Sequence, residues 1–262
     1  MNSPNSCARV DPKVTTVTRE CDKHGEYQAR ELVVAAGLGL KPFTSGCPQC
    51  AAEHAAETRA RELADVERAR LSKVAALHAG SGIPKRFEGK RIEDYTDVAP
   101  GQQRIRALAE RYIAKFPQQP GASLIFCGKP GTGKTHIACG IGHALIEAGQ
   151  RVAFSTVLAA IRGIKETYRQ GSERSEADAI ARLVSPALLI LDEVGVQTGS
   201  DHEKMLLFEV INERYQACVA TILISNLTRE ELTAYLGDRM LDRFREGGAV
   251  VAFDWQSYRG TP

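Results

Sequence analysis

The stretch GKPGTGKT at Gly128–Thr135 decides the fold that the rest of the chain has to build. It matches G-x-x-x-x-G-K-[ST] and stands between the apolar run ASLIFCG and the helical pattern HIACGIGHALIEAG, as a phosphate-binding loop requires. Lys134 would reach the β and γ phosphates of ATP, and the Thr135 hydroxyl would hold Mg²⁺. A glycine-rich turn that matches by chance is the alternative, and the strand and helix around the motif argue against it. The predicted nucleotide contacts are Gly128, Lys129, Pro130, Gly131, Thr132, Gly133, Lys134, Thr135 and His136.

Two other strand ends carry polar residues that suit phosphate chemistry. Asp192 and Glu193 close the apolar run ALLILDE, where Asp192 would lie near Mg²⁺ and Glu193 would orient or deprotonate a water molecule. Asn226 closes the run TILISN and would contact the γ-phosphate or that water. The alternatives are two carboxylates that simply meet solvent and an asparagine that serves a turn. Together with Lys134, these residues form a predicted catalytic set for ATP hydrolysis.

Strand and helix patterns alternate from about Gln102 to the end of the chain. Fully apolar strands separated by helices predict an α/β fold, with a parallel sheet that helices cover on both faces. The expected divisions are a polar tail at 1–20, a cysteine-containing module at 21–50, a charged helix at 51–79, an irregular linker at 80–101 and the nucleotide-binding domain at 102–262.

The cysteine-containing module has the spacing of a zinc site. Cys21-x-x-His24 and Cys47-x-x-Cys50 are separated by 22 residues and together offer four nitrogen and sulfur ligands to a tetrahedral Zn²⁺. A segment of about thirty residues buries too little surface to fold unaided, so the metal would supply its stability. The alternatives are reduced thiols without a metal, or a redox pair in CPQC.

Charge and composition exclude several classes of protein. The formal net charge is +2, so any nucleic-acid binding must come from a local patch rather than from the field of the whole molecule. The first twenty residues lack the apolar stretch of a secretory signal, and no run of eighteen apolar residues occurs. We therefore expect a cytoplasmic protein without a membrane partner.

With these motifs in place, the chain resembles AAA+ ATPases of the DnaC-type replicative helicase loader family over most of residues 80–262. The matching stretches are GIPKRFEGKRIEDY, GKPGTGKTHIACGIGHAL, LLILDEVG, LFEVINERY, ISNL and LGDRMLDRFREGGAVVAFDWQSYRG. The resemblance implies an AAA+ P-loop core with little or no C-terminal lid. A zinc module in front of that core is characteristic of some phage and prophage relatives.

The resemblance also assigns roles to arginines near the end of the chain. Arg239 or Arg243 would act as an arginine finger that completes the site of a neighbouring copy, which implies self-assembly into a ring or spiral with ATP. Arg259 would be a second sensor of bound nucleotide. Because Arg239 and Arg243 are four residues apart, they share one helix face, and the alternative is a pair of surface arginines.

The function implied by the resemblance is an ATP-switched loader that places the replicative hexameric helicase on single-stranded DNA. Ile83, Pro84 and Phe87 would pack by the adenine. One alternative is an IstB-type transposition helper, which shares the phosphate loop, the DE strand and the ERY helix. Another is an adaptor in which ATP turnover has no role, although such an adaptor has no need of Glu193.

The residues that contact DNA are less clearly marked. Basic side chains lie along the helical insertion before the DE strand, where related loaders line a central passage: Arg162, Lys165, Arg169 and Arg174. Acidic residues are interspersed with them, so a solvated face of mixed charge is an equal alternative. Trp255 and Tyr258 would stack on a base, or else belong to the core.

Overall fold

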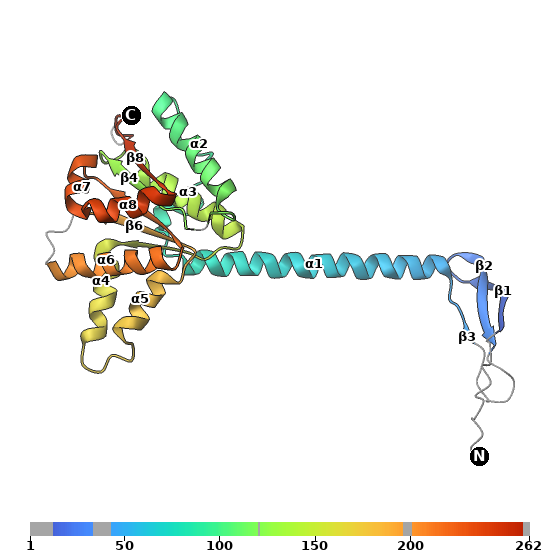
Figure 1. Ribbon diagram of the computed structural model, residues 1–262. Coiled ribbons are helices and arrows are strands. Elements are labelled where there is room, and N and C mark those ends of the chain that lie inside the picture. Colours follow the sequence, from blue (N-terminus) through green and yellow to red (C-terminus); the bar gives the residue numbers. More distant parts are fainter. Residues whose placement is uncertain (1–12, 34–42, 120, 196–200, 259–262) are drawn as a thin grey trace, which may run out of the picture. The chain divides into compact units, whose positions relative to one another are not determined.

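The structure is a computed structural model that describes residues 13–33, 43–119, 121–195 and 201–258 (Figure 1). The chain divides into two compact units, Met1–Arg70 and Leu71–Pro262. Because the boundary falls within the long helix α1 (Pro48–Gly80), each unit contains part of that helix. None of the described helices is long and apolar enough to cross a membrane.

The first unit contains a small antiparallel sheet. β1 (Lys13–Cys21) pairs with β2 (Gly25–Val33), and β2 pairs with the short β3 (Phe43–Thr44). In β1 the sequence KVTTVTREC is rich in β-branched residues, which favour a strand. The polar tail predicted for residues 1–20 must therefore be corrected for residues 13–20, which belong to β1.

The predicted charged helix at 51–79 lies within α1. The helix has no buried residue, in keeping with its many charged side chains, and ion pairs such as that of Glu67 with Arg70 at 2.8 Å link successive turns. Towards its end, Leu77 packs against the core of the second unit.

The second unit is built on a five-stranded parallel sheet in the order β5-β6-β7-β4-β8. Four of these strands match the apolar runs in the sequence, whereas the last one was not assigned from its pattern. The strands are β4 (Leu124–Gly128), β5 (Val152–Thr156), β6 (Leu188–Val194), β7 (Ala220–Ser225) and β8 (Ala249–Phe253).

Helices cover both faces of the sheet, as predicted (Figure 1). They are α2 (Pro100–Lys115), α3 (Lys134–Glu147), α4 (Val157–Lys165), α5 (Glu176–Val184), α6 (Asp201–Gln216), α7 (Arg229–Leu236) and α8 (Asp238–Gly247). Short 3₁₀ turns lie at η1 (Lys85–Phe87) and η2 (Glu166–Tyr168). In the described residues up to 258, no helix follows β8, so the core has no helical lid there.

The strands supply side chains to two separate cores because successive residues point to opposite faces. Phe126 of β4 lies in the core that α2 and α3 cover, whereas its neighbours Ile125 and Cys127 lie in the core beneath α4 to α8. The parallel pairing places the carboxyl ends of β4, β6 and β7 at one edge of the sheet, which brings the three predicted motifs together.

The segment 80–101, expected to be an irregular linker, has irregular backbone but packs against the sheet. Ile92 and Tyr95 are each only 3% exposed and belong to the core that α2 and α3 cover. At the edge strand β5, the N–H of Phe154 donates to the carbonyl of Ser81 at 2.7 Å. This segment is therefore part of the second unit.

Candidate functional site

The loop Gly128–Thr135 connects the end of β4 to the start of α3, the context that the motif predicted. Gly128, Gly131 and Gly133 have φ angles of 120°, 78° and 92°, which favour glycine over residues with a side chain. A Cβ on Gly128 would also lie 2.4 Å from the carbonyl oxygen of Phe253. The glycines of the motif are thus required by the backbone itself.

Lys134 lies within the curve of this loop. It is only 5% exposed, and its Nζ donates to the carbonyls of Gly128 and Lys129, each at 2.7 Å. These bonds hold the ammonium group at the first turn of α3, where the helix start also favours anions. The position suits the phosphate contact predicted for Lys134.

Thr135 and Asp192 meet at the predicted metal position. The hydroxyl of Thr135 donates to Oδ2 of Asp192 at 2.9 Å, and the N–H of Glu193 donates to Oδ1 of Asp192 at 2.7 Å. Hydroxyl and carboxylate oxygens are hard donors of the kind that Mg²⁺ prefers. The donor set therefore fits Mg²⁺, with Thr135 and Asp192 as the residues that would hold it.

Glu193 has an unusual backbone conformation. Its φ is 64°, and an irregularity in the β6–β7 pairing falls between Leu191 and Val194. A left-handed conformation is uncommon for glutamate, and such strain concentrates at functional sites. Ser225 supports this bend by donating from its hydroxyl to the carbonyl of Val194 at 2.7 Å. The bend leaves the Glu193 side chain exposed at the end of β6.

Several of these residues line one cavity of about 500 Å³, the candidate nucleotide cavity. Asp192, Glu193 and Asn226 line it together with most of the phosphate loop, so the structure brings together the strand ends that the sequence singled out. Phe87 also lines this cavity. Ile83 lines a different cavity, and its contact with the adenine stays a prediction.

Ile83 is held there by the packing of α3. Its Cδ1 would lie 3.4 Å from a Cβ on Gly142, so the side chain rests on a glycine of that helix. His143 and His78 line the same second cavity, with their Nδ1 atoms 3.3 Å apart. Pro84, the third residue predicted by the adenine, caps η1.

The two candidate finger arginines lie on α8 outside the nucleotide cavity. Arg239 is exposed and forms no hydrogen bond or ion pair with any residue that the structure describes. Arg243 is half-buried and lies over the ring of Tyr215, with 5.3 Å between its Cζ and the ring centre. Arg259, the predicted second sensor, lies outside the described residues.

The basic residues of the helical insertion differ in their surroundings. Arg162, Arg169 and Arg174 are exposed, whereas Lys165 forms an ion pair with Glu203 at 2.7 Å. Three of the four predicted DNA contacts are therefore open to solvent.

Trp255 belongs to the core rather than to a surface that could stack on DNA. Its ring contacts Phe253, with 5.0 Å between the ring centres, and its Nε1 donates to the carbonyl of Thr132 at 3.0 Å. Tyr258 also lines the nucleotide cavity, and its hydroxyl donates to the carbonyl of Thr96 at 2.5 Å. Of the two alternatives for these aromatic residues, base stacking is thus disfavoured.

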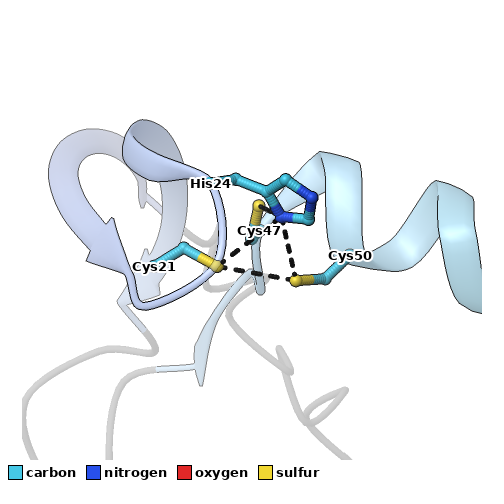
Figure 2. A group of neighbouring side chains, drawn as sticks. All are labelled: Cys21, His24, Cys47 and Cys50. Atoms are coloured by element: carbon cyan, nitrogen blue, oxygen red, sulfur yellow. Dashed lines mark hydrogen bonds between the residues drawn. The ribbon is translucent and has the colours of Figure 1, made fainter.

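The four predicted zinc ligands form one cluster in the first unit (Figure 2). The Cys21 and Cys50 sulfurs are 3.5 Å apart, and His24 Nδ1 lies 3.8 Å, 3.6 Å and 3.3 Å from the sulfurs of Cys21, Cys47 and Cys50. Around a tetrahedral Zn²⁺, the expected edges are about 3.8 Å between sulfurs and about 3.6 Å between sulfur and nitrogen. The donor set therefore fits zinc.

The backbone explains how these residues meet. Cys21 ends β1 and pairs with Gly25, whose φ of 73° allows the tight turn that carries His24. Cys47 precedes the start of α1, and Cys50 lies in its first turn. Backbone N–H groups in the turn lower the pKa of Cys21 to about 6, whereas the neighbouring Cys21 sulfur raises the pKa of Cys50 to about 11, so without a metal the thiolate forms first at Cys21.

Glu53, one turn after Cys50, contacts the outer nitrogen of the predicted ligand His24. Its Oε1 lies 3.1 Å from Nε2 of His24, and its Oε2 accepts from Nζ of Lys23 at 2.6 Å. A carboxylate on the outer nitrogen fixes the tautomer in which Nδ1 faces the metal. Sequence reasoning missed Glu53, although its spacing of three residues from Cys50 on a helix was an available signal.

Several known proteins are similar to this chain. A family model described as IstB-like ATP binding protein matches residues 70–261. The replicative helicase loader DnaC of Escherichia coli strain K12 is 37% identical over 180 residues, which cover 68% of this chain and 73% of that protein. DnaC of Buchnera aphidicola subsp. Schizaphis graminum is 35% identical, with the same coverage. A crystal structure of the DnaC helicase loader matches with a TM-score of 0.58 and 24% identity, over 64% of this chain and 99% of that chain.

Proposed function

This chain belongs to the IstB-like ATP-binding proteins, and we propose that it is an ATP-dependent loader that delivers a replicative hexameric helicase onto single-stranded DNA. The observation that carries this proposal is the 37% identity to a replicative helicase loader over 68% of the chain. In this proposal, ATP binding and hydrolysis switch the loader between states that hold and release the helicase.

The nucleotide site supports hydrolysis rather than a purely structural ATP. Lys134 and the loop N–H groups would bind the phosphates, and Mg²⁺ held by Thr135 and Asp192 would neutralise phosphate charge. Glu193 has an exposed carboxylate at the cavity and would orient or deprotonate the attacking water, which Asn226 would also contact. An adaptor without turnover has no need of this carboxylate.

The arginines of α8 support assembly of several copies. Neither Arg239 nor Arg243 lines the nucleotide cavity of its own chain, so either would complete the site of a neighbour. Arg239 is the better candidate, because Arg243 already lies over Tyr215. A head-to-tail contact of this kind propagates as a ring or an open spiral, which suits a ring-shaped partner.

The zinc module and the insertion would supply the contacts with partners. We assign one structural Zn²⁺ to Cys21, His24, Cys47 and Cys50 of the first unit. This unit would bind the helicase. The exposed arginines of the insertion would contact single-stranded DNA through its phosphates.

A second candidate function is that of an IstB-type transposition helper, favoured by the description of the matching family model. Co-purification with the host replicative helicase, with and without ATP, separates the two. The loader proposal expects the helicase to be retained, with retention that changes when ATP is added. Retention of a transposase and not of the helicase would support the alternative.

A further inference from the structure

Two aromatic side chains donate hydrogen bonds to the same backbone carbonyl of the phosphate loop. The carbonyl of Thr132 accepts from the hydroxyl of Tyr95 at 3.3 Å and from Nε1 of Trp255 at 3.0 Å. We propose that Tyr95 and Trp255 are positioning residues, which fix the phosphate loop in its binding conformation before ATP arrives. This inference rests on the nucleotide site of the proposed function and adds residues that its motifs do not contain.

Because the peptide bond is planar, the contacts of this carbonyl also set the direction of an N–H group that would bind phosphate. The carbonyl of Thr132 and the N–H of Gly133 belong to one peptide unit, in which they point in opposite directions. When two donors hold the carbonyl, the N–H must face away from them. The N–H of Tyr258 holds the preceding peptide in the same way, because it donates to the carbonyl of Gly131 at 2.9 Å. Two successive loop N–H groups are thereby oriented.

Burial makes these hydrogen bonds costly to remove. Thr132 is fully buried, so its carbonyl cannot turn to water if both donors are lost. Tyr95 also fills the space beside Gly133, where a Cβ would lie 2.5 Å from its Cε2. The ring of Tyr95 thus holds the glycine that allows the turn, and its hydroxyl holds the peptide.

The donors come from two segments of the second unit that are far apart in the sequence. Tyr95 precedes α2, whereas Trp255 and Tyr258 follow β8. The two segments are joined to each other, because the hydroxyl of Tyr258 donates to the carbonyl of Thr96 and accepts from Nε2 of Gln102 at 2.6 Å. Phosphate binding and docking of the segment after β8 therefore stabilise each other.

The test removes single donors while keeping an aromatic ring at each position. Trp255→Phe loses the indole N–H, and Tyr95→Phe loses the hydroxyl. Tyr112→Phe is the matched control, because it removes a buried hydroxyl that donates to the carbonyl of Ala122 at 2.7 Å, away from the nucleotide cavity. All three proteins would be compared for thermal unfolding without nucleotide and for binding of a fluorescent ATP analogue.

We expect each of the first two variants to bind the analogue about five- to tenfold more weakly, and their combination to bind on the order of 50-fold more weakly. The control should lose stability but keep the affinity of the parent. Trp255 is the only tryptophan of the chain, so its fluorescence should change when ATP binds to the parent and the control.

Two results would overturn the inference. One is unchanged affinity in both Trp255→Phe and Tyr95→Phe. The other is a loss of affinity that follows the loss of stability equally in all three variants, which would indicate packing alone. A parent protein that binds no ATP would instead overturn the proposed nucleotide site, and this inference with it.

Discussion

The nucleotide site and the cysteine cluster are stabilised in opposite ways. The nucleotide site joins three strand ends of a buried sheet, and hydrogen bonds within the chain hold its loop in place. Among the described residues of the first unit, by contrast, only Ala29 and Cys47 are buried. A unit with so small a core cannot offset its loss of conformational entropy by burial alone. The nucleotide site therefore depends on a fold that exists without it, whereas the proposed Zn²⁺ would stabilise the fold of the first unit.

Removal of zinc is the change with the largest expected effect, and it should affect the first unit alone. A structural Zn²⁺ contributes about 10–16 kcal/mol in small metal-dependent units, far more than the first unit could lose and stay folded. Chelation, or Cys47→Ser, should abolish amide protection in β1 and β2 and also helicase binding, yet leave ATP affinity unchanged. Hydrogen exchange measures the amide protection, co-purification measures helicase binding, and titration with a fluorescent ATP analogue measures the affinity for ATP. Protein purified without chelator that contains no zinc would contradict the assignment.

Lys134→Ala tests the other side of the comparison. Because the motif assigns this ammonium to the β and γ phosphates, its loss should abolish ATP binding at working concentrations. Zinc content should stay the same. Lys115→Ala, at the end of α2, is the control. Binding of ATP at the parental affinity by Lys134→Ala would show that the phosphates lie elsewhere.

Arg239→Ala asks whether the nucleotide site is complete within one chain. Loss of an arginine finger costs about 10³ to 10⁵ in rate where it has been measured, while ATP affinity is nearly kept. Mixed with Lys134→Ala, the variant should recover some hydrolysis, because intact fingers then meet intact loops. Arg245→Ala, on the same helix, is the control. Normal phosphate release by Arg239→Ala would show that Arg239 is only a solvent-exposed surface residue.

Glu193→Gln separates binding from chemistry within the nucleotide site. The amide keeps the shape of the side chain but cannot accept a proton, so hydrolysis should fall by about 10² to 10⁴ while ATP still binds. Glu213→Gln, an exposed residue of α6, should behave as the parent. Phosphate release under saturating ATP is the measurement. Normal turnover in Glu193→Gln would remove the role assigned to this carboxylate.

Glu53→Gln gives the smallest expected effect and sharpens the comparison at the metal. Loss of an outer carboxylate typically weakens metal binding by about 10- to 100-fold. Competition of the protein with a chelator for Zn²⁺ measures this, and Glu57→Gln on the next turn of α1 is the control. Equal affinities for the two variants would show that Glu53 does not orient His24.

The two sites also differ in how far the sequence predicts them. The phosphate loop and the cysteine pairs are short motifs whose spacing is set by local backbone, so their residues and the four apolar strands followed from pattern alone. Contacts between distant segments did not. Tyr95 and Trp255 meet at Thr132 only after the sheet has formed, and no local periodicity marks that meeting.

Local patterns were also ambiguous where strands and linkers are short. The run AVVAF, which forms β8, has only five residues and was not assigned as a strand, although Gly247 and Gly248 separate it from the helical pattern before it. The segment 80–101 has the composition of a linker, yet Ile92 and Tyr95 are apolar anchors whose burial depends on the sheet. The composition of such a segment predicts that its backbone is irregular, but it does not predict which residues the segment packs against.

The most direct test of the loader itself is the amount of host replicative helicase placed on circular single-stranded DNA. It should be measured with the parent protein, with Lys134→Ala and without ATP. We predict helicase on the DNA only with the parent and ATP, because the nucleotide site is the switch. Equal loading by Lys134→Ala, or equal loading without ATP, would contradict the account.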